Sequence, residues 1–157
     1  MTERAFDMKH ALRYAIHSEY HAAAFYRQWA QETSGAAKEQ IEGLAEWEDQ
    51  HRRSLSGYYA RLFGEEVNLD PSFGVDPGLV VQADEFRNHY ALVRIASTVY
   101  VTEMRAAEMY DQMARHAADP EGAKIFSDIA DMERGHMQEA LAMYQRLRED
   151  QAGSLML

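Results

Sequence analysis

The sequence predicts an all-α fold, a four-helix bundle in which a long crossover joins two antiparallel helix pairs. Three observations support this prediction. The chain has only three prolines and long runs of residues that favour helix. Apolar residues recur along these runs at steps of three and four, which is the period of one helix face. The first half of the sequence also returns in the second half, which indicates that a helix pair is duplicated.

The repeat is centred on a Glu and a His three residues apart, a spacing that places both side chains on one helical face. Each Glu-x-x-His motif follows a lone Glu by 29 or 30 residues, and each lone Glu is followed by Ala three positions later and by Tyr seven positions later. Equivalent residues are offset by 84 or 85 positions. The two copies are Glu19, Tyr26, Glu48 and His51, and Glu103, Tyr110, Glu133 and His136.

The first helix pair should be a tight hairpin. We expect the first helix from about Arg4 to Thr33, and Ser34-Gly35 leaves room only for a sharp reversal, so the second helix should lie antiparallel to it. The second helix should end near Gly64, because glycine readily adopts the left-handed conformation that terminates many helices. The expected inward stripes are Leu12, Ile16, Glu19, Ala22, Ala23, Tyr26 and Ala30, and Ile41, Leu44, Glu48, His51, Leu55, Tyr58 and Leu62.

The segment from Gly64 to about Asp84 breaks the pattern with two Asp-Pro steps and further glycines. A connection of this length allows the second pair to start from the far end of the first. The fourth helix should open at Asp119-Pro120-Glu121, which combines an N-cap, a proline at the first helical position and an acid near the positive end of the helix dipole. The expected inward stripes are Leu92, Ile95, Val99, Glu103, Ala106, Tyr110 and Ala114, and Phe126, Ile129, Glu133, His136, Ala140, Met143 and Leu147.

Length, charge and composition restrict the class of protein. We expect a single domain over residues 1–150, with a flexible tail over residues 151–157. The formal net charge of −10 argues against nucleic acid or an anionic membrane as a partner. The absence of cysteine excludes disulfides, thiolate zinc sites, iron–sulfur clusters and a rubredoxin-type centre. Without an apolar run long enough for a signal peptide or a membrane span, a cytoplasmic location is expected.

The six Glu and His residues of the repeat interrupt otherwise apolar stripes. Burying four carboxylates without partners would cost several kcal/mol each. Two divalent cations would balance the four negative charges, and two neutral imidazoles would complete the set. Oxygen and nitrogen donors without thiolate suit iron or manganese. The alternative is a plain bundle in which the same residues form salt bridges and hydrogen bonds between helices, although no Arg or Lys interrupts these stripes.

Di-iron carboxylate bundles have a characteristic arrangement of ligands. Two of their helices each supply one Glu, and the other two each supply a Glu-x-x-His motif. Over residues 5 to 148 the chain resembles ferritin-like proteins of the rubrerythrin group. The resemblance implies a ferritin-like four-helix bundle with two iron ions, although manganese or a mixed pair would fit the same donors. It assigns the metal ligands as Glu19, Glu48, His51, Glu103, Glu133 and His136.

Within that ligand set, the resemblance makes Glu48 and Glu133 the bridging carboxylates. Two departures stand out. Full-length rubrerythrins carry a cysteine-rich rubredoxin domain, which is absent from this sequence. They also have a second Glu three residues after the lone Glu of the third helix, where this chain has Ala106. The six-ligand set is therefore closer to the more symmetric bacterioferritin-like centre.

Other residues near the motifs have less specific interpretations. Tyr26 and Tyr110 lie two turns after the lone glutamates, where they could act in catalysis, by hydrogen-bonding the ligand carboxylates or carrying a radical, or could simply be core aromatics. Glu46 and Glu108 should face solvent. An aromatic group, Tyr58, Tyr59 and Phe63, either forms a dimer contact or packs in the core. The histidines outside the repeat are predicted to be surface residues: His10, His17, His21, His89 and His116.

Two functions are considered. The first is an oxidoreductase, a rubrerythrin-like peroxidase or oxidase, in which a di-iron centre reacts with H2O2 or O2 and an external donor protein resupplies electrons. The second is iron handling, with Fe(II) oxidised for storage or delivery. A homodimer favours the first and a large cage the second. An oxygenase for an organic substrate would need a pocket, for which the sequence shows no insertion, and a purely structural bundle would bind no metal.

Overall fold

The computed structural model describes residues 5–155, with side chains described up to residue 150. It contains four long helices, α1 (Met8–Gln31), α2 (Gly35–Phe63), α3 (His89–Arg115) and α4 (Pro120–Leu155). Two short 3-10 turns, Pro77–Leu79 and Ala83–Arg87, lie in the connection between α2 and α3. No strand occurs in the described residues, so the predicted all-α four-helix bundle is confirmed.

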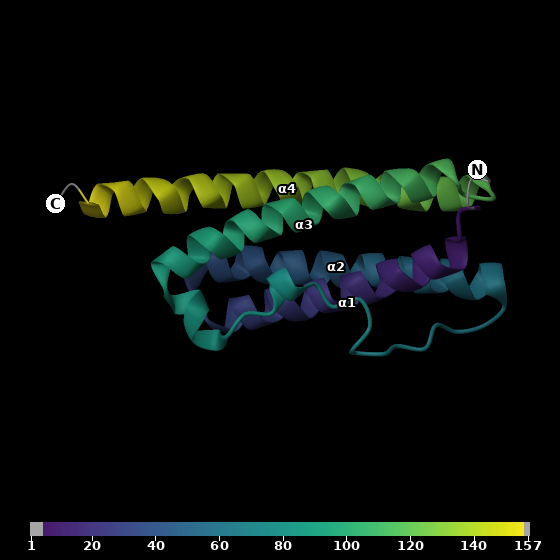
Figure 1. Cartoon of the computed structure of the whole chain (residues 1–157), viewed down its shortest axis with the longest axis horizontal. Helices are drawn as coiled ribbons and strands as arrows, with labels where there is room; N and C mark the ends of the chain where they lie inside the picture. Colours follow the sequence, from purple (N-terminus) through teal and green to yellow (C-terminus); the bar gives the residue numbers. More distant parts are fainter. Residues whose placement is uncertain (1–4, 156–157) are drawn as a thin grey trace.

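The helices form two antiparallel hairpins, α1 with α2 and α3 with α4 (Figure 1). The segment that follows α2 runs back along the bundle, so that α3 starts from the opposite end, as the crossover prediction required (Figure 1). Gly64 ends α2 with a positive φ of 67°. Such a conformation strains any residue with a Cβ, which explains why glycine stands there.

Two helices begin later than expected, and in both cases a side-chain cap sets the boundary. The Asp7 carboxylate accepts a hydrogen bond from the His10 amide at 3.0 Å, so α1 begins at Met8 rather than near Arg4, which lies outside the described residues. Asn88 accepts from the Ala91 amide at 3.1 Å, so α3 begins at His89 rather than near residue 84. Capping satisfies amides of the first turn that have no helical partner.

The last helix extends beyond the expected end of the domain. The backbone of α4 is helical to Leu155, five residues into the segment 151–157 that the sequence marks as a tail. Side chains beyond Asp150, and residues 156 and 157 entirely, lie outside the described part of the chain. The flexibility of this tail therefore stays a prediction. None of the helices in the described part combines the length and apolar character that a membrane crossing requires.

The surface assignment of His17 is wrong. Its side chain is fully buried and anchors the crossover, because the Asp70 amide donates to Nε2 at 2.9 Å. The ring proton therefore sits on Nδ1, which donates to the Arg13 carbonyl at 2.7 Å. His21 is half-buried, and its Nε2 donates to the Phe73 carbonyl at 2.9 Å. Two turns of α1 thus hold the crossover by its backbone.

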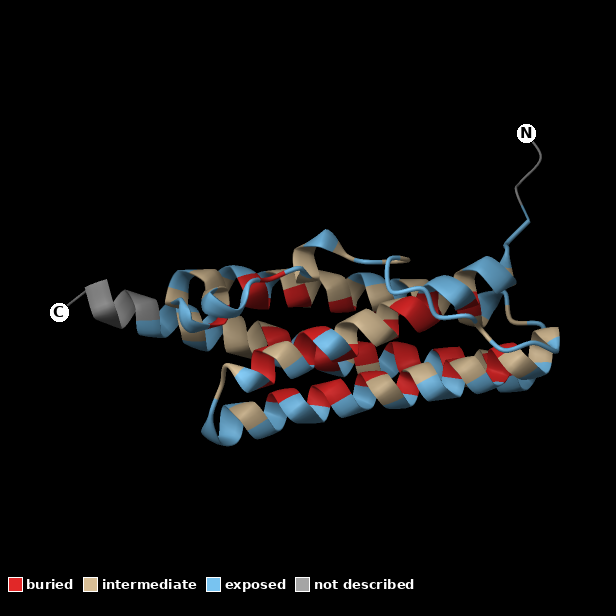
Figure 2. Ribbon diagram, turned by 90° about the horizontal axis from the view of Figure 1, so that it is seen from below, coloured by how far each residue is buried: buried red, intermediate tan, exposed pale blue. Residues whose placement is uncertain are grey.

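Buried residues recur along all four helices (Figure 2). Apolar residues form two clusters, one around Phe25, Trp29 and Ile41, and the other around Leu12, Leu55 and Phe126. Tyr58 and Tyr59 are 2% and 4% exposed and belong to the second cluster. Of the two interpretations of the aromatic group, core packing therefore holds for these two tyrosines.

Asp119 offers a test of how α4 begins. Its Oδ1 accepts from the Gly122 amide at 2.7 Å and its Oδ2 from the Tyr58 hydroxyl at 3.0 Å. Asp119→Ala should lower the free energy of unfolding by about 0.5–2 kcal/mol. Asp128→Ala, which removes only an exposed pair with Lys124, should cost at most about 0.5 kcal/mol. Urea denaturation measures both, and equal losses would show that the cap does not stabilise α4.

Candidate metal centre

Six polar side chains meet in the middle of the bundle, and all six were selected from the sequence. Glu19 comes from α1 and Glu103 from α3, while α2 and α4 each contribute one Glu-x-x-His motif. None is more than 6% exposed. The helical period brings the Glu and the His of each motif to the same inward face. The complete set is Glu19, Glu48, His51, Glu103, Glu133 and His136.

The six side chains form two overlapping groups, each with ligand atoms within 4.8 Å of one another. One group contains Glu19 and His51, and the other contains Glu103 and His136. Glu48 and Glu133 belong to both groups. These are the two carboxylates that the resemblance marks as bridging, and that role stays a prediction with which their membership of both groups agrees.

The two imidazoles turn the same ring nitrogen towards the carboxylates. Nδ1 of His51 lies 3.2 Å from Oε1 of Glu133, and Nδ1 of His136 lies 3.1 Å from Oε1 of Glu48. Each His thus reaches the Glu of the opposite hairpin. On the far side of the first ring, Nε2 of His51 lies 3.4 Å from the Met132 sulfur. The Nδ1 atoms are therefore the donors that face a common centre.

The two tyrosines of the repeat also reach across the hairpins. The Tyr26 hydroxyl donates to Oε1 of Glu103, and the Tyr110 hydroxyl donates to Oε1 of Glu19. Both rings are buried, with 2% and 0% exposed. Each tyrosine therefore satisfies its hydroxyl inside the core by occupying one oxygen of a carboxylate. The second oxygen of Glu19 lies 3.4 Å from Nδ1 of His51.

Without metal, the electrostatics of this cluster are strongly perturbed. Burial, together with the charges of Glu19 and Glu103, raises the pKa of Glu48 to about 8. Burial and the charge of Glu133 raise the pKa of Glu103 well above its usual value. Burial alone would lower the pKa of His51, but the close carboxylates of Glu133, Glu19 and Glu48 raise it to about 12. Glu48 and Glu103 therefore resist ionising in the absence of cations. Glu19 behaves differently, because its polar neighbours Glu48, His51 and Tyr110 outweigh burial and lower its pKa.

The hydrogen bonding of the cluster is incomplete in a way that fits a metal site. Four buried atoms of the cluster have no hydrogen-bond partner among the described residues: Glu19 Oε2, Glu48 Oε1, Glu133 Oε1 and His51 Nδ1. Among the described residues, the ion pairs of these carboxylates are all with His51 or His136, and none is with Lys or Arg. Such buried orphan atoms cost free energy that a bound divalent cation would recover. The plain salt-bridge alternative leaves them unexplained.

The fold and the donor set together define a class of protein, a four-helix bundle with a buried carboxylate–histidine site for metal. The family model described as rubrerythrin matches residues 10–144, so the chain belongs to the rubrerythrin family, a ferritin-like di-iron family. A solved structure of a hypothetical protein from Pyrococcus furiosus is similar over 94% of each chain, with a TM-score of 0.73 and 27% sequence identity. No curated protein matches the chain.

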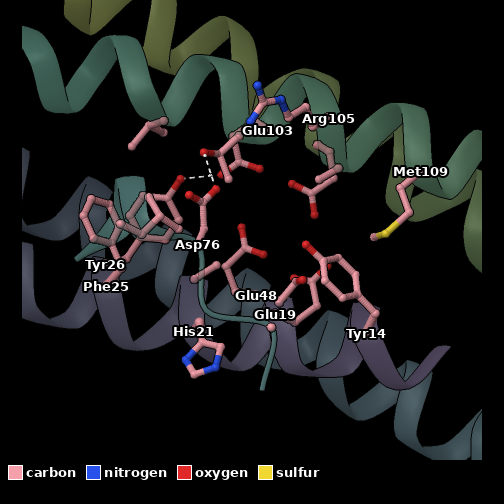
Figure 3. A pocket seen from close by; sticks show the side chains of 18 of the residues that line it. Tyr14, Glu19, His21, Phe25, Tyr26, Glu48, Asp76, Glu103, Arg105 and Met109 are labelled. Atoms are coloured by element: carbon pink, nitrogen blue, oxygen red, sulfur yellow. Dashed lines mark hydrogen bonds between the residues drawn. The ribbon is translucent and has the colours of Figure 1, made fainter. Parts of the chain in front are cut away.

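A cavity of about 160 Å³ reaches the carboxylates from the side of α1 and α3. Glu19, Glu48 and Glu103 point into it, with Tyr14 and Met109 at one end and Phe25 and Tyr26 at the other (Figure 3). The crossover supplies part of the wall through Gly74, Asp76 and Leu79. The sequence pattern identified this segment only as a connection, because no local signal shows which helices it covers.

Glu46 and Glu108 are exposed, as expected, and point away from the cluster. His10 and His116 are exposed, whereas His89 is half-buried and its Nε2 donates to the Leu147 carbonyl at 2.9 Å. None of the five other histidines belongs to the two donor groups found in the described residues.

Glu48 and Glu133 should matter more for metal binding than any neighbouring acid. Each belongs to both donor groups, so Glu48→Ala or Glu133→Ala should abolish binding of a metal pair. Glu46→Ala removes an exposed acid two residues away and should leave the metal content unchanged. Elemental analysis after loading with Fe(II) or Mn(II) and dialysis provides the measurement. Equal loss of metal from Glu46→Ala would show that the wrong helix face was assigned.

The raised pKa values predict how pH affects the metal-free protein. A group whose pKa is higher in the folded state contributes stability at low pH that is lost as pH rises towards the folded pKa. Because the pKa of Glu48 is raised from 4.5 to about 8, the metal-free protein should lose stability through this group between about pH 5 and pH 8. The pKa of His51 is raised from 6.5 to about 12, so its contribution begins to fall only above about pH 6.5. Metal-loaded protein holds the carboxylates ionised and should not show this loss.

Thermal melts of metal-free and metal-loaded samples across this pH range test the prediction. The gap between the two melting temperatures should widen as pH rises. A constant gap would mean that the four carboxylates do not share one buried site.

Proposed function

We propose that this protein is a non-haem di-iron oxidoreductase that reduces H2O2, or O2, with electrons from an external donor protein. The observation that carries the proposal is the pair of donor groups that share Glu48 and Glu133. Such an arrangement suits two metal ions held side by side. Iron at this position would supply the one-electron redox steps that the side chains themselves cannot perform.

Peroxide reduction requires electrons, protons and a path by which the oxidant reaches the site. Reduction of H2O2 takes up two electrons and two protons and yields two molecules of water. The cavity supports access for such a small oxidant, because it extends from the buried glutamates to Tyr14 and Arg105, which are exposed. The apolar residues around the cluster limit bulk water at the same time.

The tyrosines have a positioning role in this proposal. Tyr26 and Tyr110 donate to Glu103 and Glu19 and hold one oxygen of each terminal carboxylate in place. Burial and the neighbouring glutamate charges raise the pKa of both phenols well above the ordinary value, so both keep their protons at neutral pH. Each hydroxyl can therefore stay a donor while the charge at the site changes.

Iron handling is the second candidate function, and Ala106 favours it. This residue lies in the cavity wall, where the resemblance to rubrerythrins would place a second Glu. Without that carboxylate the donor set is symmetric, as in a centre that oxidises Fe(II) for storage or delivery. Fe(II) would then be the substrate and would leave the site after oxidation.

The stoichiometry of turnover separates the two functions. Protein loaded anaerobically with Fe(II) should consume one H2O2 for every two electrons supplied by a reductant, over many turnovers and with constant bound iron. A ferroxidase would instead oxidise added Fe(II) far beyond the number of binding sites and release or store it. Size-exclusion chromatography adds an independent observation, because a dimer supports the first function and a large cage supports the second.

Matched tyrosine variants test the positioning role. Tyr26→Phe and Tyr110→Phe remove only a hydroxyl and should slow peroxide reduction by roughly 10–100-fold, the range found when partners of metal ligands are lost. Tyr14→Phe, which alters an exposed ring at the cavity mouth, serves as the control and should change the rate little. Unchanged rates in the two buried variants, with metal content preserved, would limit these tyrosines to core packing.

A further inference from the structure

The cavity beside the donor cluster is larger and more apolar than access for H2O2 requires. Its volume is about 160 Å³, whereas about 10–15 Å³ is enough to hold one water molecule. Between the glutamates and the mouth, the wall is mainly hydrocarbon. The apolar side chains are Ala22, Phe25, Leu79, Val99, Ala106 and Met109.

From these features we infer that the cavity binds one small, uncharged and mainly apolar organic molecule next to the metal centre. An engineered apolar cavity of about 150 Å³ in an unrelated protein holds benzene, so the ligand should have roughly six to eight non-hydrogen atoms. The inference rests on the proposed function for its chemical meaning, since a molecule held there would present C–H bonds to an oxidising centre. Its binding can be measured without any turnover.

Two small residues create the space. Ala22 and Ala106 occupy equivalent positions in the repeat, three residues after Glu19 and Glu103, and both line the cavity. Each faces the space from a different helix, α1 and α3. A larger side chain at either position would project into the cavity from its wall. The duplication therefore places a small residue on each of the two helices that border this one cavity.

The charges around the cavity favour an uncharged ligand. Two divalent cations would balance the four glutamates at the floor. At the mouth, Asp76 and Arg105 carry opposite charges. The Asp76 carboxylate is already engaged, since Oδ1 accepts from the Gly78 amide at 2.8 Å and Oδ2 from the Thr102 hydroxyl at 3.4 Å. Figure 3 shows Asp76 beside Glu103 and Arg105 above it.

The crossover walls one side of this cavity, which stays open at its mouth. Gly74, Asp76 and Leu79 close the side that α1 and α3 leave open. His17 and His21 hold the preceding residues, Asp70 and Phe73, by their backbone. The buried side of a bound molecule would therefore contact fixed walls, which reduces the entropic cost of binding.

Ligand-detected NMR on zinc-loaded protein tests binding without redox chemistry. Benzene and 1-hexanol should bind the unmodified protein, while hexanoate, which carries a charge, should not. Ala106→Leu should weaken benzene binding by at least about tenfold, because the added methyl groups occupy the cavity. Ala24→Leu, an exposed position on α1, should bind benzene as the unmodified protein does. Absence of benzene binding, or equal binding by Ala106→Leu, would overturn the inference.

Crystals of the unmodified protein under xenon pressure give a second test that needs no variant. Xenon should occupy a peak between Ala22 and Ala106, and no peak there would contradict the inference. Zinc content measured on the NMR samples reports on the metal site separately. If the protein binds benzene but holds no metal, the cavity inference is supported and the proposed function is contradicted. If the protein binds its full complement of metal but no benzene, the cavity inference is contradicted and the metal site is supported.

Discussion

Four carboxylates buried in one layer of a helical bundle are the constraint on which the rest of the structure depends. Glu19, Glu48, Glu103 and Glu133 are each at most 5% exposed, and several of their oxygens have no hydrogen-bond partner. Like charges at this depth oppose ionisation unless cations compensate them. The apolar clusters on either side of the layer must therefore supply stability that the metal-free layer removes.

The contacts of the cluster cross from one hairpin to the other. Tyr26 of α1 reaches Glu103 of α3, and Tyr110 of α3 reaches Glu19 of α1. The imidazoles repeat this exchange between α2 and α4. These reciprocal contacts follow the duplication in the sequence, and they give the site an approximate twofold arrangement. Metal bound there would join the two hairpins as well as supply chemistry.

Features set by local sequence were predictable, whereas those set by distant backbone were not. The Glu-x-x-His spacing follows from the helical period, and Gly64 and Asp119 act within one turn of their own helix ends. His17 was misassigned because its partner amide lies 53 residues away, in a segment without periodicity. The cavity was missed for the same reason, since the crossover walls one side of it and no pattern shows where a loop will lie.

The central claim, that the six side chains hold two iron ions, can be tested most directly by anomalous diffraction. Crystals of protein loaded anaerobically with Fe(II) should be measured above and below the iron absorption edge. We predict two peaks roughly 3.5–4 Å apart. Both should lie in contact with Glu48 and Glu133, each with one His and one further Glu. A single peak would contradict the account. The absence of any peak, with the glutamates hydrogen-bonded to one another, would also contradict it.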